Sequence, residues 1–368
     1  MSIPARIGFQ QRVLPVYRVP FFKLLANTCS DGFSLFAGEP RHVETIEQSR
    51  GETGFNFYPA WNFHLMSGKT YLCWQINLMR WLRKWDPEVL ILEANMRYLM
   101  QDEAIRWMHA RGRPVIGWGL GSKITAGGNS SVASMLRKRF IRQFDALVTY
   151  SALGAEQYKQ TGFQTDRVFV AQNAVTSKPL DLIPGKTNSS NRDHLVVLFV
   201  GRLQSRKRVD FLIRACSALP SAQKPELWVV GDGPEKENLM ALARQVYPAA
   251  KFFGALHGKD LEPAFTGADL FVLPGTGGLA VQQAMTFGLP VIVAEADGTR
   301  EDLVRPENGW LLPSGEGPAL RATLLEALSD RERLRQMGQE SYRIVMEEIN
   351  IENMVAVFEQ AVRAVWEK

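Results

Sequence analysis

The sequence predicts an α/β protein made of two doubly wound domains, each built on a parallel sheet. Apolar runs of strand length alternate with helical patterns along almost the whole chain of 368 residues, which is typical of parallel sheets with crossover helices. That length exceeds what one ordinary hydrophobic core accommodates, so two domains are expected. Residues 177–193 are rich in Pro, Gly, Ser and Asn and lack periodicity, which indicates a linker.

The first half of the chain carries one alternating series. Its predicted strands are residues 6–10, 88–94, 113–119, 145–151 and 167–172. The helical patterns between them cover residues 70–85, 98–111, 130–143 and 152–160. We therefore expect an N-terminal Rossmann-like domain over residues 1–185.

The second half repeats the pattern. Its predicted strands are residues 195–200, 226–231, 250–254, 269–275 and 289–294, with helices over 207–218 and from about residue 235. Residues 351–366 have apolar side chains near helical spacing, at Met354, Val355, Phe358, Val362 and Val365. We expect a C-terminal domain over 186–350 and a final helix over 351–368 that packs back toward the N-terminal domain.

Composition excludes several classes of protein. With 46% hydrophobic and 22% charged residues, the chain is typical of a globular protein rather than a disordered or fibrous one. No apolar stretch approaches the 18 residues of a membrane span, and the first residues lack the apolar core of a secretory signal. Three scattered cysteines and no histidine pair predict neither a disulfide framework nor a metal site. We expect a cytoplasmic protein.

Charge is unevenly distributed. Residues 1–185 hold 22 Lys and Arg against 14 Asp and Glu, although the whole chain carries only +5. Segments 73–85 and 135–144 combine Trp, Phe and Leu with Arg and Lys on predicted helices, which suits an anionic membrane surface. The alternative is that their aromatic side chains face the core and their cations are solvated. No nucleic-acid-binding motif accompanies the charge, so nucleic acid is not an expected partner.

Two cations follow the first strand of the second domain. The apolar run 195–200 ends at Gly201, Arg202 comes next at the carboxyl edge of the sheet, and Lys207 is predicted to begin a helix. Ligands of open α/β sheets bind at that edge, and two fixed cations there suit a diphosphate. The alternative is two solvated surface cations.

Three glycine-containing turns accompany these cations. The strand at 226–231 leads through Asp232 and Gly233 into a helix opened by Pro234, and the strand at 250–254 ends at Gly254, where a nucleobase can lie against the backbone. Either can also be an ordinary turn or strand end.

The third turn is the most specific. A loop with Gly275, Gly277 and Gly278 opens a helix from about Leu279, and such a loop presents free N–H groups and the positive helix end to a phosphate. The alternative is a Gly-rich turn that allows close packing.

Together and in this order, these segments resemble the C-terminal domain of the retaining glycosyltransferases of family 4. The family pattern has five parts: GRL, a Lys five residues after the Arg, GDGPE, F-x-G and EAM-x-x-G-x-PVI. This chain matches it with GRLQSRK, GDGPE, FFG and QAMTFGLPVI, over about 150 residues. The resemblance implies the GT-B fold, two Rossmann-like domains facing each other across a cleft. It also implies a UDP- or GDP-sugar donor in the C-terminal domain, whose leaving diphosphate Arg202 and Lys207 neutralise. The donor-binding residues it implies are Gly201, Asp232, Gly233, Gly254, Gly277, Gly278, Leu279 and Gln283.

The chain departs from the family at two glutamates. Gly275 and Gln283 occupy their positions. Gln283 can still hydrogen-bond a ribose hydroxyl, but it carries no charge, and Gly275 offers the donor sugar no side chain. Gln282 is expected to point to a different helix face.

The N-terminal segment R-IGFQ-QRVLPVYRVPFFKLL looks like the opening of bacterial polysaccharide glycosyltransferases of this family. Gln11, Arg12 and Val13 occupy the predicted turn after the first strand. There Arg12 can reach the diphosphate or simply be solvated. The expected acceptor-binding residues are Arg18, Glu93, Asn95 and Arg97.

The resemblance implies a retaining transfer of a hexose to a hydroxyl of a sugar or a lipid-linked acceptor, as in polysaccharide or glycolipid synthesis. No metal or cofactor is expected beyond the nucleotide-diphosphate sugar itself, and the enzyme is placed in the cytoplasm or at the inner face of the membrane. Two alternatives stay open: a nucleotide-sugar epimerase of GT-B shape and a non-catalytic nucleotide-sugar-binding protein.

Overall fold

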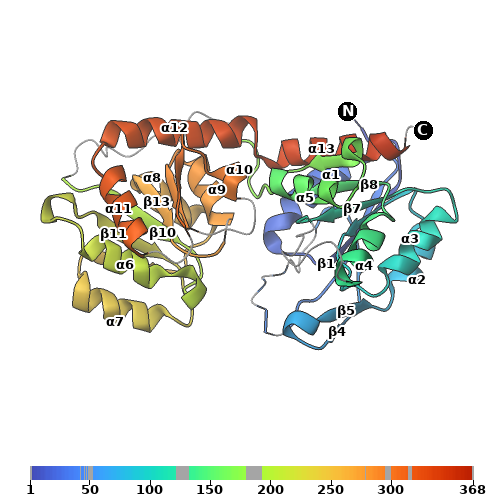
Figure 1. The fold of residues 1–368 in the computed structure, drawn as a ribbon, viewed down its shortest axis with the longest axis horizontal. Coiled ribbons are helices and arrows are strands. Elements are labelled where there is room, and N and C mark those ends of the chain that lie inside the picture. Colours follow the sequence, from blue (N-terminus) through green and yellow to red (C-terminus); the bar gives the residue numbers. More distant parts are fainter. Residues whose placement is uncertain are drawn as a thin grey trace. The chain divides into compact units, whose positions relative to one another are not determined.

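The computed structural model describes residues 2–41, 43, 44, 46, 48, 53–121, 132–179, 193–277, 279–294, 300–313 and 317–366. They form two compact units, labelled by element in Figure 1. The first unit is Met1–Val175 together with Ile351–Lys368, and the second is Thr176–Asn350. Most of the predicted linker lies outside the described residues.

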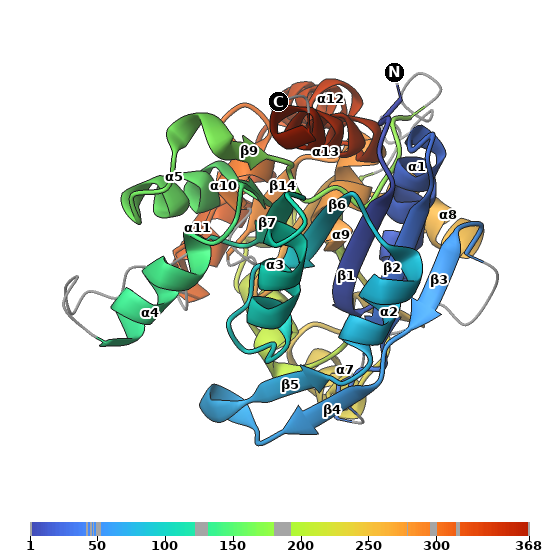
Figure 2. The same ribbon diagram turned by 90° about the vertical axis from the view of Figure 1, so that its right-hand side faces the viewer.

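The first unit is built on a sheet of seven parallel strands in the order β3-β2-β1-β6-β7-β8-β9 (Figure 2). The central strand β1 (Ile7–Val13) has neighbours β2 and β6, so the order of connection reverses there. The remaining strands are β2 (Phe33–Gly38), β3 (Asn56–Pro59), β6 (Val89–Glu93), β7 (Val115–Gly119), β8 (Ala146–Thr149) and β9 (Val168–Val170).

Helices cover both faces of this sheet. They are α1 (Val19–Thr28), α2 (Leu78–Trp85), α3 (Gln101–His109), α4 (Val132–Ile141), α5 (Ala152–Gln160) and the C-terminal α13 (Ile351–Trp366). Helix α13 packs against α1 and β8, and all five apolar residues identified in its sequence are buried. Phe358 on this helix lies 5.2 Å from Phe21 and 5.3 Å from Trp118, measured between ring centroids.

The second unit has six parallel strands in the order β12-β11-β10-β13-β14-β15. They are β10 (Val196–Val200), β11 (Glu226–Val230), β12 (Ala250–Gly254), β13 (Leu270–Leu273), β14 (Val291–Val293) and β15 (Gly309–Leu311). Its helices are α6 (Val209–Ser217), α7 (Lys236–Val246), α8 (Glu262–Gly267), α9 (Leu279–Thr286), α10 (Arg300–Leu303), α11 (Gly317–Ala327) and α12 (Arg331–Glu347). The predicted fold of two parallel-sheet α/β domains is confirmed.

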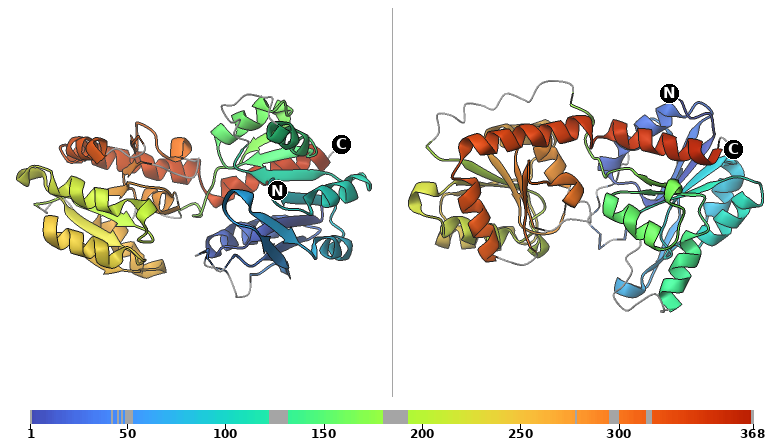
Figure 3. Two further views of the ribbon diagram at one scale, coloured as in Figure 1. Left: turned by 60° about the horizontal axis from the view of Figure 1, so that its bottom comes forward. Right: turned by 45° about the horizontal axis from the view of Figure 1, so that its top comes forward.

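The structure corrects two local predictions in the first unit. Residues 11–13 form the end of β1 rather than a turn, because Val13 still pairs with Gly38 of β2 after a bulge. The predicted helix over 70–85 begins only at Leu78, because residues 72–75 form β5 (Leu72–Gln75), which pairs antiparallel with β4 (Asn62–Leu65). The β4–β5 hairpin lies at one end of the first unit, apart from its main sheet (Figures 2 and 3).

Helix α2 also resolves the two interpretations of its aromatic side chains. Trp81 and Leu82 are buried, and Trp85 donates from Nε1 to the carbonyl oxygen of Ile7 at 2.9 Å. The tryptophans of α2 therefore face the core, as in the alternative interpretation, and this helix presents no aromatic face to a membrane.

A third correction concerns Lys207. It ends a short 3-10 turn, Ser205–Lys207, instead of starting the helix. The next residue, Arg208, has a left-handed backbone with φ of 55°, so α6 begins only at Val209.

Candidate active site

Two loops meet at the carboxyl edge of the second sheet, one after β10 and the other after β13. The two strands are hydrogen-bonded neighbours, so the ends of both lie together. The backbone N–H of Thr276 donates to the carbonyl oxygen of Arg206 at 3.0 Å, and Lys207 Nζ donates to the carbonyl oxygen of Thr276 at 2.6 Å. The ammonium group is thereby held over the loop that leads into α9.

The glycines of this loop are required by close packing. A Cβ atom on Gly275 would collide with the carbonyl oxygen of Arg206, and one on Gly277, whose φ is 135°, would collide with Lys207 Nζ. Gly278 lies outside the described residues. The loop can approach Lys207 this closely only because positions 275 and 277 lack side chains.

A third loop, after β11, joins the same edge. Leu203 N donates to the carbonyl oxygen of Asp232 at 2.8 Å, and Gly231 N donates to that of Gly254 at 2.7 Å. A Cβ atom on Gly233 would collide with the carbonyl oxygen of Leu203. The structure thus brings Gly201, Arg202, Asp232, Gly233 and Gly254 to one edge, where the Arg202 side chain is exposed.

Asp232 is held in its charged form. Its carboxylate accepts from Lys236 Nζ at 2.8 Å and from the backbone N–H of Gly233 at 2.7 Å. These hydrogen bonds, that from Lys236 first, lower the pKa of Asp232. Since an ionised carboxylate only accepts hydrogen bonds, Asp232 suits hydroxyl donors of a ligand and not phosphate oxygens.

The two neighbouring glutamines of α9 lie on different faces of the helix, as predicted. Gln282 is buried and donates from Nε2 to the carbonyl oxygen of Ile349 at 2.6 Å, whereas Gln283 is exposed. Gln282 therefore anchors the helix, and Gln283 is available to a ligand.

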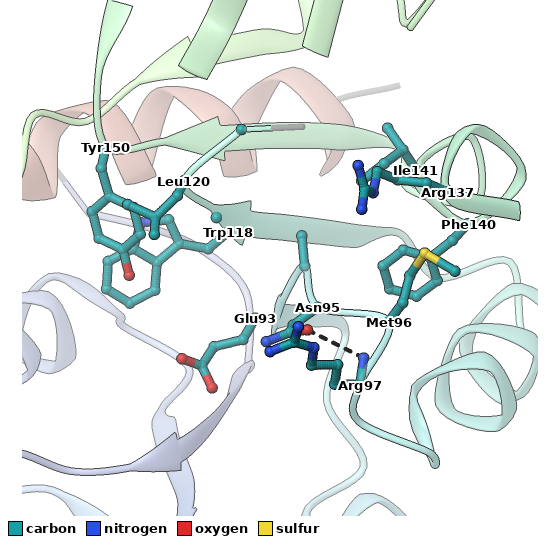
Figure 4. A pocket seen from close by; sticks show the side chains of 13 residues that line it. Glu93, Asn95, Met96, Arg97, Trp118, Leu120, Arg137, Phe140, Ile141 and Tyr150 are labelled. Atoms are coloured by element: carbon teal, nitrogen blue, oxygen red, sulfur yellow. Dashed lines mark hydrogen bonds between the residues drawn. The ribbon is translucent and has the colours of Figure 1, made fainter. Parts of the chain in front are cut away.

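The first unit contains a separate cavity of about 410 Å³ at the carboxyl ends of β6 and β7 (Figure 4). Glu93, Asn95 and Arg97 all line it, so the structure brings together three of the four residues predicted to bind the acceptor. Asn95 Oδ1 accepts from the backbone N–H of Arg97 at 3.1 Å. The other lining residues are Ala94, Met96, Trp118, Gly119, Leu120, Gly121, Arg137, Phe140, Ile141 and Tyr150.

The wall of this cavity is largely aromatic and apolar, which the sequence did not reveal. The rings of Trp118 and Tyr150 lie 4.7 Å apart on one side, and Met96 and Phe140 lie on the other (Figure 4). Flat aromatic faces beside hydrogen-bonding groups suit the mixed surface of a sugar ring. The signal in the sequence was slight, because Trp118 and Tyr150 occupy different predicted strands about 30 residues apart.

Arg18, the fourth predicted acceptor residue, does not line the cavity. It is buried behind the aromatic wall, with its guanidinium 5.2 Å from the ring of Trp118 and 5.5 Å from that of Tyr150. It donates to Asn173 Oδ1 and to the carbonyl oxygen of Ala174. In this position Arg18 supports the wall and makes no direct approach to a ligand in the cavity.

Arg12, predicted to reach the diphosphate, is engaged in an ion pair within the first unit. Its Nη1 lies 2.7 Å from Glu44 Oε2, and Arg41 binds the same carboxylate at 2.8 Å. Burial alone would raise the pKa of Glu44, but the hydrogen bonds from Arg12 and Arg41 lower it overall. A contact between Arg12 and a donor requires this pair to open, and the contact stays a prediction.

Glu93 is an acidic residue of the cavity whose pKa is shifted. Burial raises the pKa of its carboxyl group, although the backbone N–H of Arg12 donates to Oε2 at 2.6 Å and opposes the shift. Glu93 therefore keeps its proton at higher pH in the folded protein than in the unfolded chain, where a glutamate has a pKa of about 4.3.

This shift predicts a pH dependence of stability that Glu93→Gln removes. The stabilisation from a raised carboxyl pKa is complete below the unfolded pKa and is lost as the pH rises toward the folded one. Above a pH of about 4.3, the free energy of unfolding of Glu93→Gln should rise relative to that of wild type, by at most about 1.4 kcal/mol per pH unit. Urea unfolding of both proteins from pH 4 to 8 measures the difference, and a difference independent of pH would contradict the prediction.

The described residues contain no group of three or more His, Cys, Asp or Glu side chains that could hold a metal ion. The three cysteines are buried as free thiols. Within the same part of the chain, no helix has both the length and the apolar character needed to cross a membrane.

Comparisons with known proteins agree with this arrangement. Residues 185–344 match the model of the family described as glycosyl transferases group 1. The GDP-mannose-dependent alpha-mannosyltransferase of Mycobacterium tuberculosis is 39% identical over 124 residues, covering 33% of this chain and 31% of that protein. The lipopolysaccharide core biosynthesis glycosyltransferase LpsE of Rhizobium meliloti is 25% identical over 211 residues, covering 56% and 61%. The chain thus spans less than two thirds of the length of these relatives.

Solved structures are similar over nearly the whole chain. The apo form of the lipopolysaccharide outer core galactosyltransferase WaaB superimposes with a TM-score of 0.68 at 16% identity, covering 97% of this chain and 99% of that one. Anabaena Alr3699/HepE, in complex with UDP and glucose, gives a TM-score of 0.68 at 15% identity, covering 98% and 100%. At such identities these likenesses concern the fold.

Two parallel-sheet units and three glycine-bearing loops at one sheet edge define the GT-B class of glycosyltransferase folds. Residues 185–344, which lie in the second unit, match the model of glycosyl transferases group 1. The resemblance carried by residues 201–293 is thereby confirmed.

Proposed function

We propose that the protein is a retaining glycosyltransferase that moves a hexose from a nucleotide-diphosphate sugar to a hydroxyl of a sugar or lipid-linked acceptor. The observation that carries the proposal is the position of Lys207. Its ammonium group is hydrogen-bonded to the glycine loop at the carboxyl edge of the second sheet, where Arg202 also lies. Two cations and the first N–H groups of α9 suit the charge that grows on a departing diphosphate.

The donor half of the proposal assigns a role to each loop. Arg202 and Lys207 stabilise the leaving diphosphate, with the N–H groups near Gly277 and Leu279 beside them. Asp232 accepts hydrogen bonds from hydroxyl groups of the nucleoside, and Gln283 can both accept and donate them. The backbone at Gly201, Gly233 and Gly254 leaves room for the nucleoside. UDP- and GDP-sugars are the donors to test, because HepE was solved with UDP and glucose and the mycobacterial relative is named for GDP-mannose.

The acceptor half rests on the cavity of the first unit. The half-buried ring of Tyr150, which packs on the buried Trp118, can contact a sugar, and Asn95 and Arg97 can hydrogen-bond the hydroxyl or phosphoryl groups of the acceptor. The chemistry needs no metal in this proposal, because protein cations neutralise the diphosphate.

The experiment is a donor panel followed by an acceptor assay. In thermal-shift measurements, one class among UDP-, GDP- and dTDP-hexoses should raise the melting temperature, since a ligand of the folded state stabilises it by RT ln(1 + [L]/Kd). That donor is then incubated with sugar acceptors, and transfer with retained anomeric configuration is expected. Stabilisation by no nucleotide sugar would contradict the proposal.

The same assay separates the two rival functions. Conversion of the donor to an epimer without any acceptor would identify an epimerase. Tight donor binding without transfer to any sugar or lipid-linked acceptor would identify a non-catalytic binding protein. This alternative is tested because Gly275 and Gln283 stand where the family usually has glutamates.

A further inference from the structure

The β4–β5 hairpin has its polar face toward the protein and its apolar face outward. Alternate residues of a strand point to opposite faces, and the register pairs Phe63 with Trp74 and Leu65 with Leu72 on one of them. On this face, which we call the hairpin face, Phe63 is 53% exposed and Trp74 is 41% exposed. The opposite face pairs Asn62 with Gln75 and His64 with Cys73, and Gln75 and Cys73 are buried.

Hydrogen bonds hold the hairpin in this inverted orientation. Gln75 accepts from Gln10 Nε2 at 2.5 Å and donates to the carbonyl oxygen of Gln11 at 3.2 Å. Asn62 Nδ2 donates to the carbonyl oxygen of Arg12 at 2.7 Å. Because Gln10, Gln11 and Gln75 are buried and hydrogen-bonded to one another, turning the hairpin over would leave buried polar groups without partners. The hairpin face is therefore a fixed feature of the fold.

The apolar surface continues from the hairpin to α4. Two backbone hydrogen bonds join Cys73 to the segment 97–99. The N–H of Cys73 donates to the carbonyl oxygen of Arg97 at 2.8 Å, and the N–H of Leu99 donates to the carbonyl oxygen of Cys73 at 3.1 Å. Leu99 of that segment and the preceding Met96 line one depression together with Leu136 of α4, and all three are exposed. Trp61 and Met66, the residues flanking β4, and Val132 and Met135 of α4 are also exposed.

Basic side chains outnumber acidic ones around this surface, although the exposed Glu39 lines a depression with Trp61. The sequence has no Asp or Glu between Thr53 and Trp85, nor between Ala104 and Phe144. Arg97 and Arg139 are exposed beside the apolar side chains, and Arg137 lines the neighbouring cavity. Asp102 lines the same depression and accepts a hydrogen bond from Gln143.

We propose that the hairpin face docks on an anionic lipid bilayer, together with the exposed apolar side chains of α4. Exposed Trp and Phe with basic residues nearby are suited to the boundary between head groups and acyl chains. A second copy of the chain fits less well, since a symmetric contact would bring two surfaces rich in basic residues together. The inference extends the proposed function, because a lipid-linked acceptor would lie in that bilayer, but its test needs no turnover.

Vesicle co-sedimentation tests the proposal with the full chain. Wild type should pellet with vesicles of phosphatidylcholine and phosphatidylglycerol at low salt, and less at high salt or with phosphatidylcholine alone. The double variant Phe63→Ser with Trp74→Ser should lower the apparent partition constant by about 10-fold or more, because two large apolar side chains no longer leave water. Leu65→Ser should lower it less.

Leu325→Ser is the matched control for Leu65→Ser, because Leu325 is 36% exposed on α11 of the second unit against 40% for Leu65. The control should bind vesicles as wild type does, and thermal unfolding establishes that all variants are folded. Wild type remaining in the supernatant with anionic vesicles at low salt would overturn the proposal. So would a double variant that binds like wild type, or light scattering that shows a wild-type dimer which the double variant loses. None of these results bears on donor binding, so the proposed function is tested separately.

Discussion

Replacing Lys207 with methionine is expected to lower hexosyl transfer by about 100- to 1,000-fold, the usual cost of removing one preorganised group that stabilises transition-state charge. Methionine keeps most of the apolar stem but loses the ammonium group that donates to Thr276. Arg202→Ala should have a similar effect, because its guanidinium is placed at the same edge. The measurement is kcat with the donor identified by thermal shift.

Arg214→Ala is the matched control for these variants. Arg214 is an exposed arginine in the last turn of α6, away from the three loops. Its loss should leave kcat unchanged, which separates a general effect of net charge from a local one. Lys207→Arg should retain part of the activity, since it keeps the charge. If Lys207→Met and Arg202→Ala both turned over at wild-type rates, charge stabilisation by these residues would be excluded.

Gly275→Glu, which restores the residue usual in the family, is expected to damage this protein. The new side chain would start where the carbonyl oxygen of Arg206 already lies, so the loop or the 205–207 turn must move. We expect a loss of about 2 kcal/mol or more in the free energy of unfolding, as for other overpacked sites, together with lower transfer because Lys207 is displaced. Urea unfolding and kcat measure the two effects.

Gln283→Glu provides the contrast to Gly275→Glu. Gln283 is exposed on α9, so a carboxylate fits there without a steric conflict, and stability should change by less than about 0.5 kcal/mol. A stable Gly275→Glu variant with raised activity would show that the loop tolerates the family's glutamate and that our account of its packing is wrong.

The candidate donor-binding loops of the second unit were predictable because each of them is a short, continuous stretch of sequence. Each loop follows an apolar strand, so Arg202, Lys207 and the glycines could be placed at one sheet edge from the order of elements alone. What sequence could not supply was the reason for each glycine. Gly275 and Gly277 face Arg206 and Lys207, about 70 residues earlier, and such contacts appear only in three dimensions.

The first unit was less predictable for a physical reason. Its cavity gathers side chains from β6, β7, α4 and the residue after β8, and no single segment carries a recognisable pattern. Arg18 illustrates the limit: its position after the first strand suggested a ligand contact, but the fold buries it behind Trp118 and Tyr150. The hairpin was missed because residues 72–75 fall inside the predicted helix over 70–85, whereas they form a strand that pairs with residues 62–65, to which no element was assigned.

The central claim is that Arg202 and Lys207 bind the diphosphate of a nucleotide sugar at the carboxyl edge of the second sheet. A crystal structure with the intact donor tests it most directly. We predict phosphate oxygens within hydrogen-bonding distance of the Arg202 guanidinium and Lys207 Nζ, next to the loop at Gly277. A diphosphate bound elsewhere, with both side chains in contact only with solvent, would contradict the account.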